Sequence, residues 1–296
     1  MLKILLGITL IIGIIFTVTL ARDYIRKSKE GTLEKGSFLI SGIIGIIANF
    51  FDTLGVGSFA IETSLFKNLK LVDDKKIPGT LNVGATIPTI VEALIFLTVV
   101  EVEPVTLICM ILAAIAGALV GAGIISKLNE KAVQASMGIA LIAIAFLMVA
   151  GLLNLFPVGG NAIGLTGTKL VIGMVGNFIF GGLNTLGVGL YAPCMALIFA
   201  LGMDPKIAFP IMMGSGALLL PFASFKFIKS ETHSTKTSTA INICGPIGVL
   251  IAAYLVKTLP LNTLKWLVVC VVLYTSFTMF KSFMAKKETR ELNQSA

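Results

Sequence analysis

The chain has 296 residues, of which 56% are hydrophobic and only 13% are charged, and its mean hydropathy is +0.98. This composition excludes a soluble domain of this length, because stretches of about 20 apolar residues recur and each could cross a bilayer. We therefore expect an all-α integral membrane protein, since a β-barrel would show short alternating segments. The formal charge of +8 does not indicate nucleic-acid binding, because the basic residues lie in short loops between apolar segments.

Cysteine and histidine are too few and too scattered to indicate a disulfide framework, a metal site or a cofactor. The cysteines fall in apolar segments without CxxC spacing: Cys109, Cys194, Cys244 and Cys270. The one histidine, His233, is expected in a loop.

Residues 1–35 form a predicted N-terminal unit, a membrane span over 2–21 followed by a basic loop. Only Lys3 precedes the apolar stretch, whereas Arg22, Arg26, Lys27, Lys29 and Lys35 follow it. These flanks are wrong for a cleaved signal peptide. We expect a retained helix with the N-terminus outside.

Residues 36–68 form a predicted broken element. The apolar stretch 37–50 is interrupted by the string from Asp52 to Ser58, and 59–68 then continues to a loop that contains four lysines. Each arm is too short to span alone, and both flanks are basic. The element is therefore expected to enter and leave on the same side, as a re-entrant hairpin.

Full spans are predicted at 77–100, 104–126 and 132–153, which complete a first repeat over 36–153. A second repeat over 154–285 contains a broken element at 169–201, hinged at Asn184–Gly189, and spans at 206–228, 237–257 and 264–281. Residues 286–296 form a cytoplasmic tail. This topology places 18 of the 23 basic residues inside, as the positive-inside rule requires.

The two broken elements share a sequence. Asp52-Thr53-Leu54-Gly55-Val56-Gly57-Ser58 returns 132 positions later as Asn184-Thr185-Leu186-Gly187-Val188-Gly189-Leu190. Small residues that let helices pack closely would explain single glycines, but not a shared string. A matched pair of interrupted segments indicates the binding site of a secondary transporter. Because the hairpins enter from opposite sides, the fold class predicted is two inverted repeats, each a broken hairpin plus three transmembrane helices, with one extra N-terminal helix.

A helix break at membrane depth exposes backbone N–H groups, which favour an anion, and glycine lets the backbone approach it closely. The candidate substrate-binding residues are Asn49, Thr53, Gly55, Gly57, Ser58, Asn82, Asn184, Thr185, Gly187, Gly189, Ser215 and Asn242. Asn177 is a further polar residue within a span. For each asparagine the alternative is an interhelical hydrogen bond.

Asp52 and Glu92 are candidates for coupling to a proton or cation, because acids inside spans are usually functional or paired. Asp52 could instead cap the half-helix, since its counterpart Asn184 is also a good N-cap. Glu92 lies four residues after Pro88 and is the better relay candidate. Glu62 lies near the cytoplasmic end of its arm, where a carboxyl can reach the interface.

Two hydrophobic repeats that each open with a glycine-rich broken helix resemble the sulfite exporter TauE/SafE family. The residues that carry the resemblance are 45–58 with 78–85, and 173–193 with 210–217, within a region of about 36–283. The resemblance implies an eight- or nine-span transporter for sulfite, thiosulfate or organosulfonates. The chain departs from the family pattern at Asp52, which stands in a stretch typically richer in glycine. It departs again at Ile61, where the second half has Pro193.

Three other functions are weighed against a transporter: a passive anion channel, an intramembrane enzyme and a membrane scaffold. A channel would share the broken helices, whereas the sequence contains no GxSxG, HExxH or P-loop motif. The expected partners are a small anionic substrate, the lipid bilayer of the plasma membrane and a coupling proton or cation, with no nucleic acid and a homo-oligomer left open. The C-terminus is expected in the cytoplasm.

Overall fold

The computed structural model describes residues 2–54, 57–98, 101–155, 160–187, 189–204 and 207–255, together with positions 270, 273, 276, 277, 280, 281 and 284. Its helices are α1 (Leu2–Lys29), α2 (Phe38–Thr53), α3 (Phe59–Asn68), the short η1 (Asp74–Lys76), α4 (Ile77–Phe96), α5 (Pro104–Ile125), α6 (Glu130–Leu152), α7 (Gly167–Thr185), α8 (Tyr191–Ala200), α9 (Ala208–Lys229) and α10 (Thr235–Leu255). The part of the chain described here is helical, with one isolated parallel bridge between Ala162 and Met203.

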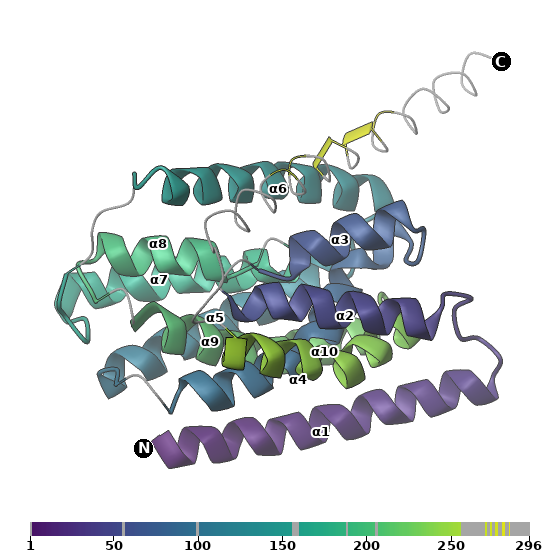
Figure 1. Ribbon diagram of the computed structural model, residues 1–296, viewed down its shortest axis with the longest axis horizontal. Coiled ribbons are helices and arrows are strands. Elements are labelled where there is room, and N and C mark those ends of the chain that lie inside the picture. The colour runs from purple at the N-terminus through teal and green to yellow at the C-terminus, as the bar shows by residue number, and fades with distance from the viewer. Residues whose placement is uncertain are drawn as a thin grey trace.

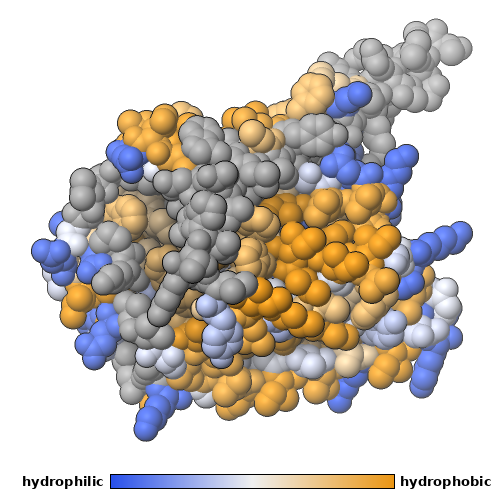
Figure 2. Space-filling view, in the orientation of Figure 1, coloured by the Kyte–Doolittle hydropathy of each residue, from blue (hydrophilic) through white to orange (hydrophobic). Residues whose placement is uncertain are grey.

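Five of the described helices are long and apolar enough to cross a membrane, as expected for a multi-pass protein. They cover Lys3–Lys29, Asp74–Phe96, Pro104–Ile125, Ala208–Lys229 and Thr235–Tyr254. Apolar residues cover the middle of the face shown in Figure 2, whereas hydrophilic ones gather at its two ends. The predicted span at 264–281 lies mostly outside the described residues, and the tail at 286–296 lies wholly outside them.

The helix boundaries repeat with the same offset of 132 positions as the sequence strings. Shifting α3 by this offset gives the bounds of α8, and shifting α4 gives those of α9 to within one residue. The offset also relates α2 to α7 and α5 to α10, to within three residues at each end. The internal repeat therefore covers the helices as well as the strings that interrupt them.

Each broken element folds back so that its two outer ends lie together. In the first, Lys76 Nζ lies 3.4 Å from Glu34 Oε1, which joins the end of the hairpin to its beginning. In the second, Lys169 Nζ donates a hydrogen bond to Leu201 O across 3.1 Å. Figure 1 shows α2 and α3 open toward one end of the molecule and α7 and α8 open toward the other.

In the core, helices of each half pack against helices of the other half. Helix α2 packs on α10, α7 packs on α5, and α4 packs on α9 between them. Glycines allow these close crossings, because a Cβ at Gly45 would lie 3.0 Å from Ile241 Cα and one at Gly182 would lie 3.4 Å from Gly117 O. Each hairpin is therefore held by a helix of the opposite half.

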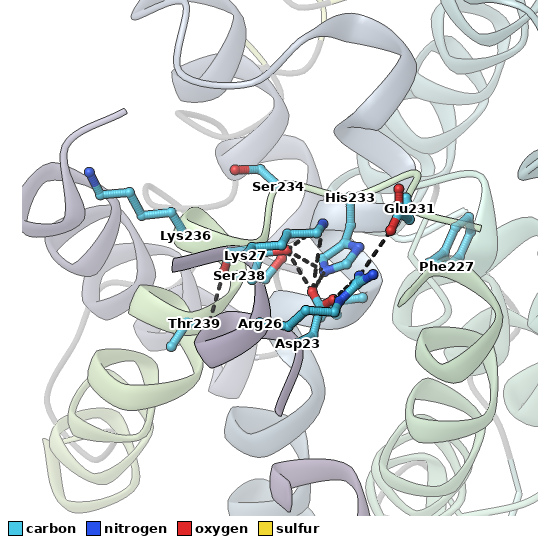
Figure 3. Close-up of polar contacts among 12 residues, drawn as sticks. Asp23, Arg26, Lys27, Phe227, Glu231, His233, Ser234, Lys236, Ser238 and Thr239 are labelled. Carbon is cyan, nitrogen blue, oxygen red and sulfur yellow. Dashed lines mark hydrogen bonds and ion pairs between the residues drawn. The ribbon is translucent and has the colours of Figure 1, made fainter. Parts of the chain in front are cut away.

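Helix α1 is tied to the rest of the protein at its C-terminal end (Figure 3). Asp23 Oδ2 accepts a 2.7 Å hydrogen bond from Thr235 Oγ1 and lies 3.4 Å from Nε2 of the buried His233. Arg26 donates to Asp23 at 2.8 Å and to Glu231 at 2.9 Å. These bonds join α1 to the α9–α10 connection. The helix is longer than the predicted 2–21, because the basic segment continues it to Lys29.

Both breaks begin later than the sequence indicated. Helix α2 continues through Thr53 and α7 through Thr185, so Asp52 and Asn184 belong to the last helical turns. Thr53 Oγ1 lies 2.9 Å from Asn49 O, one turn earlier in α2. Helix α4 ends at Phe96, earlier than the predicted residue 100, and residues 99 and 100 lie outside the described residues.

Candidate functional site

Glycine is required in both breaks by the backbone conformation. Gly57 has φ +92°, and its counterpart Gly189 has φ +81°; Gly187 has φ +96°. A Cβ at Gly57 or Gly189 would meet nothing within 4 Å, so open space adjoins both turns. Gly55, the fourth predicted glycine, lies outside the described residues.

In the first break a carboxylate of the protein occupies the start of the returning helix. Asp52 Oδ1 accepts a 2.6 Å hydrogen bond from the Ser58 backbone N–H, and α3 begins at Phe59. Asp52 is 6% exposed, so this bond lies within the protein. The geometry is that of a cap reaching across the break, in the place where an external anion would otherwise bind.

In the second break the corresponding position holds an amide. Asn184 Nδ2 donates to Asn82 Oδ1 at 3.4 Å, and Asn82 Nδ2 lies 3.4 Å from Asn184 O and 3.3 Å from Thr185 O. These bonds are long, whereas Asn82 Nδ2 donates to Pro78 O within its own helix at 2.8 Å. Leu190, the N-cap residue of α8, makes no side-chain cap bond. Among the described residues no carboxylate accepts a hydrogen bond from the first backbone N–H groups of α8.

Glu92 on α4 connects the two breaks. Its Oε1 accepts a 2.7 Å hydrogen bond from Thr53 Oγ1, at the end of α2, and its Oε2 accepts one of 2.7 Å from the Tyr191 hydroxyl, at the start of α8. Glu92 is fully buried and Tyr191 is 7% exposed. Tyr191 is not among the site residues predicted from the sequence, although it is the first residue after the shared string and a buried tyrosine hydroxyl usually needs a partner.

The other predicted amides lie in separate hydrogen-bonded pairs. Asn177 Nδ2 donates to Met110 O at 2.8 Å and to Ser215 Oγ at 3.0 Å. Asn49 Nδ2 donates to Gly45 O of its own helix. These contacts are of the interhelical and local kind considered as alternatives for each asparagine, and they do not join these side chains to either break.

Asn242 has a distinct position, inserted into the hydrogen-bond ladder of α4. Its Nδ2 donates to Val83 O at 2.7 Å and its Oδ1 accepts from the Ile87 backbone N–H at 2.9 Å. In a regular helix Val83 O and the Ile87 N–H bond each other. Pro88 is the next residue of α4. Asn242 therefore joins α10 to α4 where the latter contains a proline.

Glu62 is buried, and the expectation that its carboxyl reaches the interface is wrong. It is 0% exposed, because α3 packs against α2 and α4 inside the bundle. Within the described residues, neither of its carboxyl oxygens has a hydrogen-bond partner, and the same is true of Ser58 Oγ and Thr63 Oγ1. The first hairpin thus contains a carboxyl and two hydroxyls that the protein itself leaves unsatisfied.

Helices long enough to span a membrane, with paired and interrupted hairpins, are the arrangement expected of a polytopic membrane transporter. The family model of the sulfite exporter TauE/SafE matches residues 1–148, half of the chain, and the chain belongs to this family. No match was found among curated proteins or among solved structures. The matched region ends within α6 and contains the first hairpin, Asn82 and Glu92.

Proposed function

We propose that this protein is a secondary transporter that moves a small sulfur-containing anion, such as sulfite, thiosulfate or an organosulfonate, by alternating access. The observation that carries the proposal is the position of Glu92, which hydrogen-bonds the end of α2 and the start of α8 at once. A movement of either hairpin must break or rearrange one of these bonds. Family membership supplies the substrate class.

The proposed arrangement is a pair of inverted repeats with re-entrant hairpins. It is supported by the offset of 132 that relates the helices and by hairpins that open at opposite ends. It is also supported by the packing of α2 on α10 and of α7 on α5, because each hairpin then contacts a helix of the opposite half. Such a pair can rock about a site at mid-depth and expose it to each side in turn. The proposed orientation has the N-terminus outside and the C-terminus in the cytoplasm.

The two breaks differ in charge, and this difference favours the second as the anion site. The first has the Asp52 carboxylate on the Ser58 N–H, whereas the second has Asn184 and an uncapped α8. An oxyanion placed there would meet helix N-terminal donors and the amides of Asn82 and Asn184. The proposed binding set is Asn82, Asn184, Thr185, Gly187 and Gly189, with Thr53, Gly57 and Ser58 shaping the opposite hairpin.

Glu92 is the proposed coupling group for protons. It is fully buried, and its two hydroxyl partners stand at the moving ends of the two hairpins. Gain or loss of a proton changes whether the carboxyl can accept both bonds, and this would bias the position of the hairpins. In this proposal Asp52 caps the start of α3 and acts electrostatically on Glu92. It is not a ligand of the anion.

The proposal is tested by thermal shift of purified protein with sulfite, thiosulfate, sulfate, sulfoacetate and taurine. A bound anion raises the melting temperature through linkage, and a concentration of 100 Kd gives about 2.7 kcal/mol. Asn184→Asp should abolish the shift because it adds a carboxylate of nearly the same shape beside α8, whereas Asn177→Asp, away from the breaks, should retain it. No shift with any sulfur anion, or an unchanged shift in Asn184→Asp, contradicts the proposed site.

A further inference from the structure

The first hairpin contains a buried group of oxygen atoms that the proposed anion site does not use. Glu62 is 0% exposed, Thr63 is 0% and Ser58 is 1%. The side-chain oxygens of all three have no hydrogen-bond partner in the part of the chain that the structure describes. A buried carboxylate without a partner is strongly unfavourable, and most buried polar atoms in proteins are satisfied. This contrasts with Glu92, both of whose oxygens accept hydrogen bonds.

Backbone hydrogen bonds at the break connect two of these residues to each other and to a second acid. The Glu62 N–H donates to Ser58 O at 2.9 Å, so the two residues lie one helical turn apart on the same side of α3. The Ser58 N–H in turn donates to Asp52 Oδ1 at 2.6 Å, which adds a second carboxylate from α2. The C-terminal end of α2, with its negative dipole end, faces the same break.

This set of groups is suited to a cation. In the described part of the chain, no lysine, arginine or histidine forms an ion pair or side-chain hydrogen bond with Asp52 or Glu62. Neither the Ser58 nor the Thr63 hydroxyl donates to a carboxylate, so their lone pairs and those of Glu62 stay available. Oxygen-only ligands suit hard cations, and half-helix C-terminal ends bind Na⁺ in other transporters with broken helices.

We propose that Asp52, Ser58 and Glu62 form a binding site for Na⁺ in the first break. A monovalent ion fits better than a divalent one, because no group of three or more His, Cys, Asp or Glu side chains among the described residues is placed to hold a metal ion. Asp52 is already stabilised by the Ser58 N–H at the start of α3. The positive charge of a bound Na⁺ would therefore chiefly compensate the carboxylate of Glu62.

The two breaks then bind ions of opposite charge: Na⁺ at Asp52, Ser58 and Glu62, and the substrate anion at Asn184. The 132-residue repeat explains why one scaffold offers both sites, since Asp52 corresponds to Asn184 in the second half. Glu62 likewise corresponds to Cys194, so neither acid is repeated. The use of this site for coupling rests on the proposed transport function, whereas Na⁺ binding itself does not.

The site is tested by the melting temperature of the purified protein in NaCl, with choline chloride added to keep the ionic strength constant. We expect a saturable rise with Na⁺ and none with choline. Glu62→Gln and Ser58→Ala should each raise the half-maximal Na⁺ concentration at least tenfold. One control should keep the wild-type response: Glu101→Gln, at an exposed acid outside the hairpin.

Equilibrium binding of radioactive ²²Na⁺ to the wild-type protein provides a second measurement that does not depend on the stability of any variant. Binding that excess unlabelled NaCl displaces, and that choline does not, supports the site. Stabilisation by choline equal to that by Na⁺, absence of ²²Na⁺ binding, or full retention of binding in Glu62→Gln would overturn it. Na⁺ binding without sulfur-anion binding would instead contradict the proposed function and leave the cation site intact.

Discussion

The Tyr191 hydroxyl donates a 2.7 Å hydrogen bond to Glu92 Oε2, and this bond joins the first residue of α8 to the C-terminal part of α4. The internal repeat allows each residue of this pair to be compared with its counterpart in the other half. Tyr191 corresponds to Phe59 and Glu92 corresponds to Ser224, so the first-half counterpart of the tyrosine lacks its hydroxyl and the second-half counterpart of the acid lacks its charge. The bond therefore distinguishes the two halves and is not part of the scaffold that they share.

Tyr191→Phe tests this bond directly. It keeps the ring found in the other repeat and removes only the hydroxyl, which leaves one Glu92 oxygen without its donor. We expect a loss of about 1 kcal/mol of stability and anion flux reduced by about tenfold, because the carboxyl no longer connects both hairpins. The pH dependence of flux in proteoliposomes should flatten in Glu92→Gln. Wild-type flux and pH response in both variants would show that the bond is structural only.

The hinge glycines give a second prediction. Gly57→Leu and Gly189→Leu should abolish transport while the protein still inserts, because a residue with a side chain at positive φ is strained by about 1–2 kcal/mol and would fill the open space at the break. Gly7→Leu is the matched control, since Gly7 lies in α1 and a Cβ there also meets nothing within 4 Å. Near-normal flux in either hinge variant would assign the glycines to packing alone.

Glu34 supplies a prediction about pH and stability outside the membrane spans. Burial opposes the ionisation of Glu34. Its carboxylate accepts hydrogen bonds from its own backbone N–H and from those of Lys236 and Thr235, and Lys76 lies nearby. Together these groups hold the pKa of Glu34 below its ordinary value. A lowered pKa stabilises the fold above the unfolded-state pKa of about 4.3, and the effect is lost as pH falls through the folded pKa. Glu34→Gln should cost about 1 kcal/mol at pH 7 and progressively less below pH 4 in thermal unfolding. An equal cost at both pH values would contradict this account.

Membrane orientation is predicted from the basic residues. In a cysteine-free background, single cysteines at Lys75 and Lys229 should react with a membrane-impermeant reagent only after the membrane is opened. A cysteine at Asn161 should react in intact cells. All three positions are exposed, so accessibility depends on the side of the membrane. Labelling of positions 75 and 229 in intact cells, with protection of 161, would reverse the topology.

The sequence predicted the fold well where hydrophobic length and repetition decide it. The shared string located both breaks to within a few residues, because glycine at positive φ is a strong local constraint. It could not show that Asp52 bonds Ser58 or that Glu62 is buried, because both depend on how α3 folds back against α2 and α4. Tyr191 and Glu92 are 99 positions apart, and only the packing of α8 brings them into contact.

The sequence predicted only part of the candidate site, because contacts between distant residues depend on how the helices pack. Asn82, Asn184 and Thr185 meet as expected for residues near a hinge. Ser215 and Asn242 were chosen because they are polar and lie within spans, yet one pairs with Asn177 and the other bonds the backbone of α4. Amide and hydroxyl groups in spans serve both packing and binding, so their type alone does not separate the two roles.

The central claim, that the second break holds a sulfur-containing anion which the protein carries across the membrane, is tested most directly by counterflow in proteoliposomes. Vesicles loaded with unlabelled sulfite should accumulate radioactive sulfite above its external concentration, as a carrier does and a passive channel does not. Asn184→Asp should abolish this accumulation, whereas Asn177→Asp should retain it. Flux that only equilibrates the label, or accumulation that is undiminished in Asn184→Asp, would contradict the account.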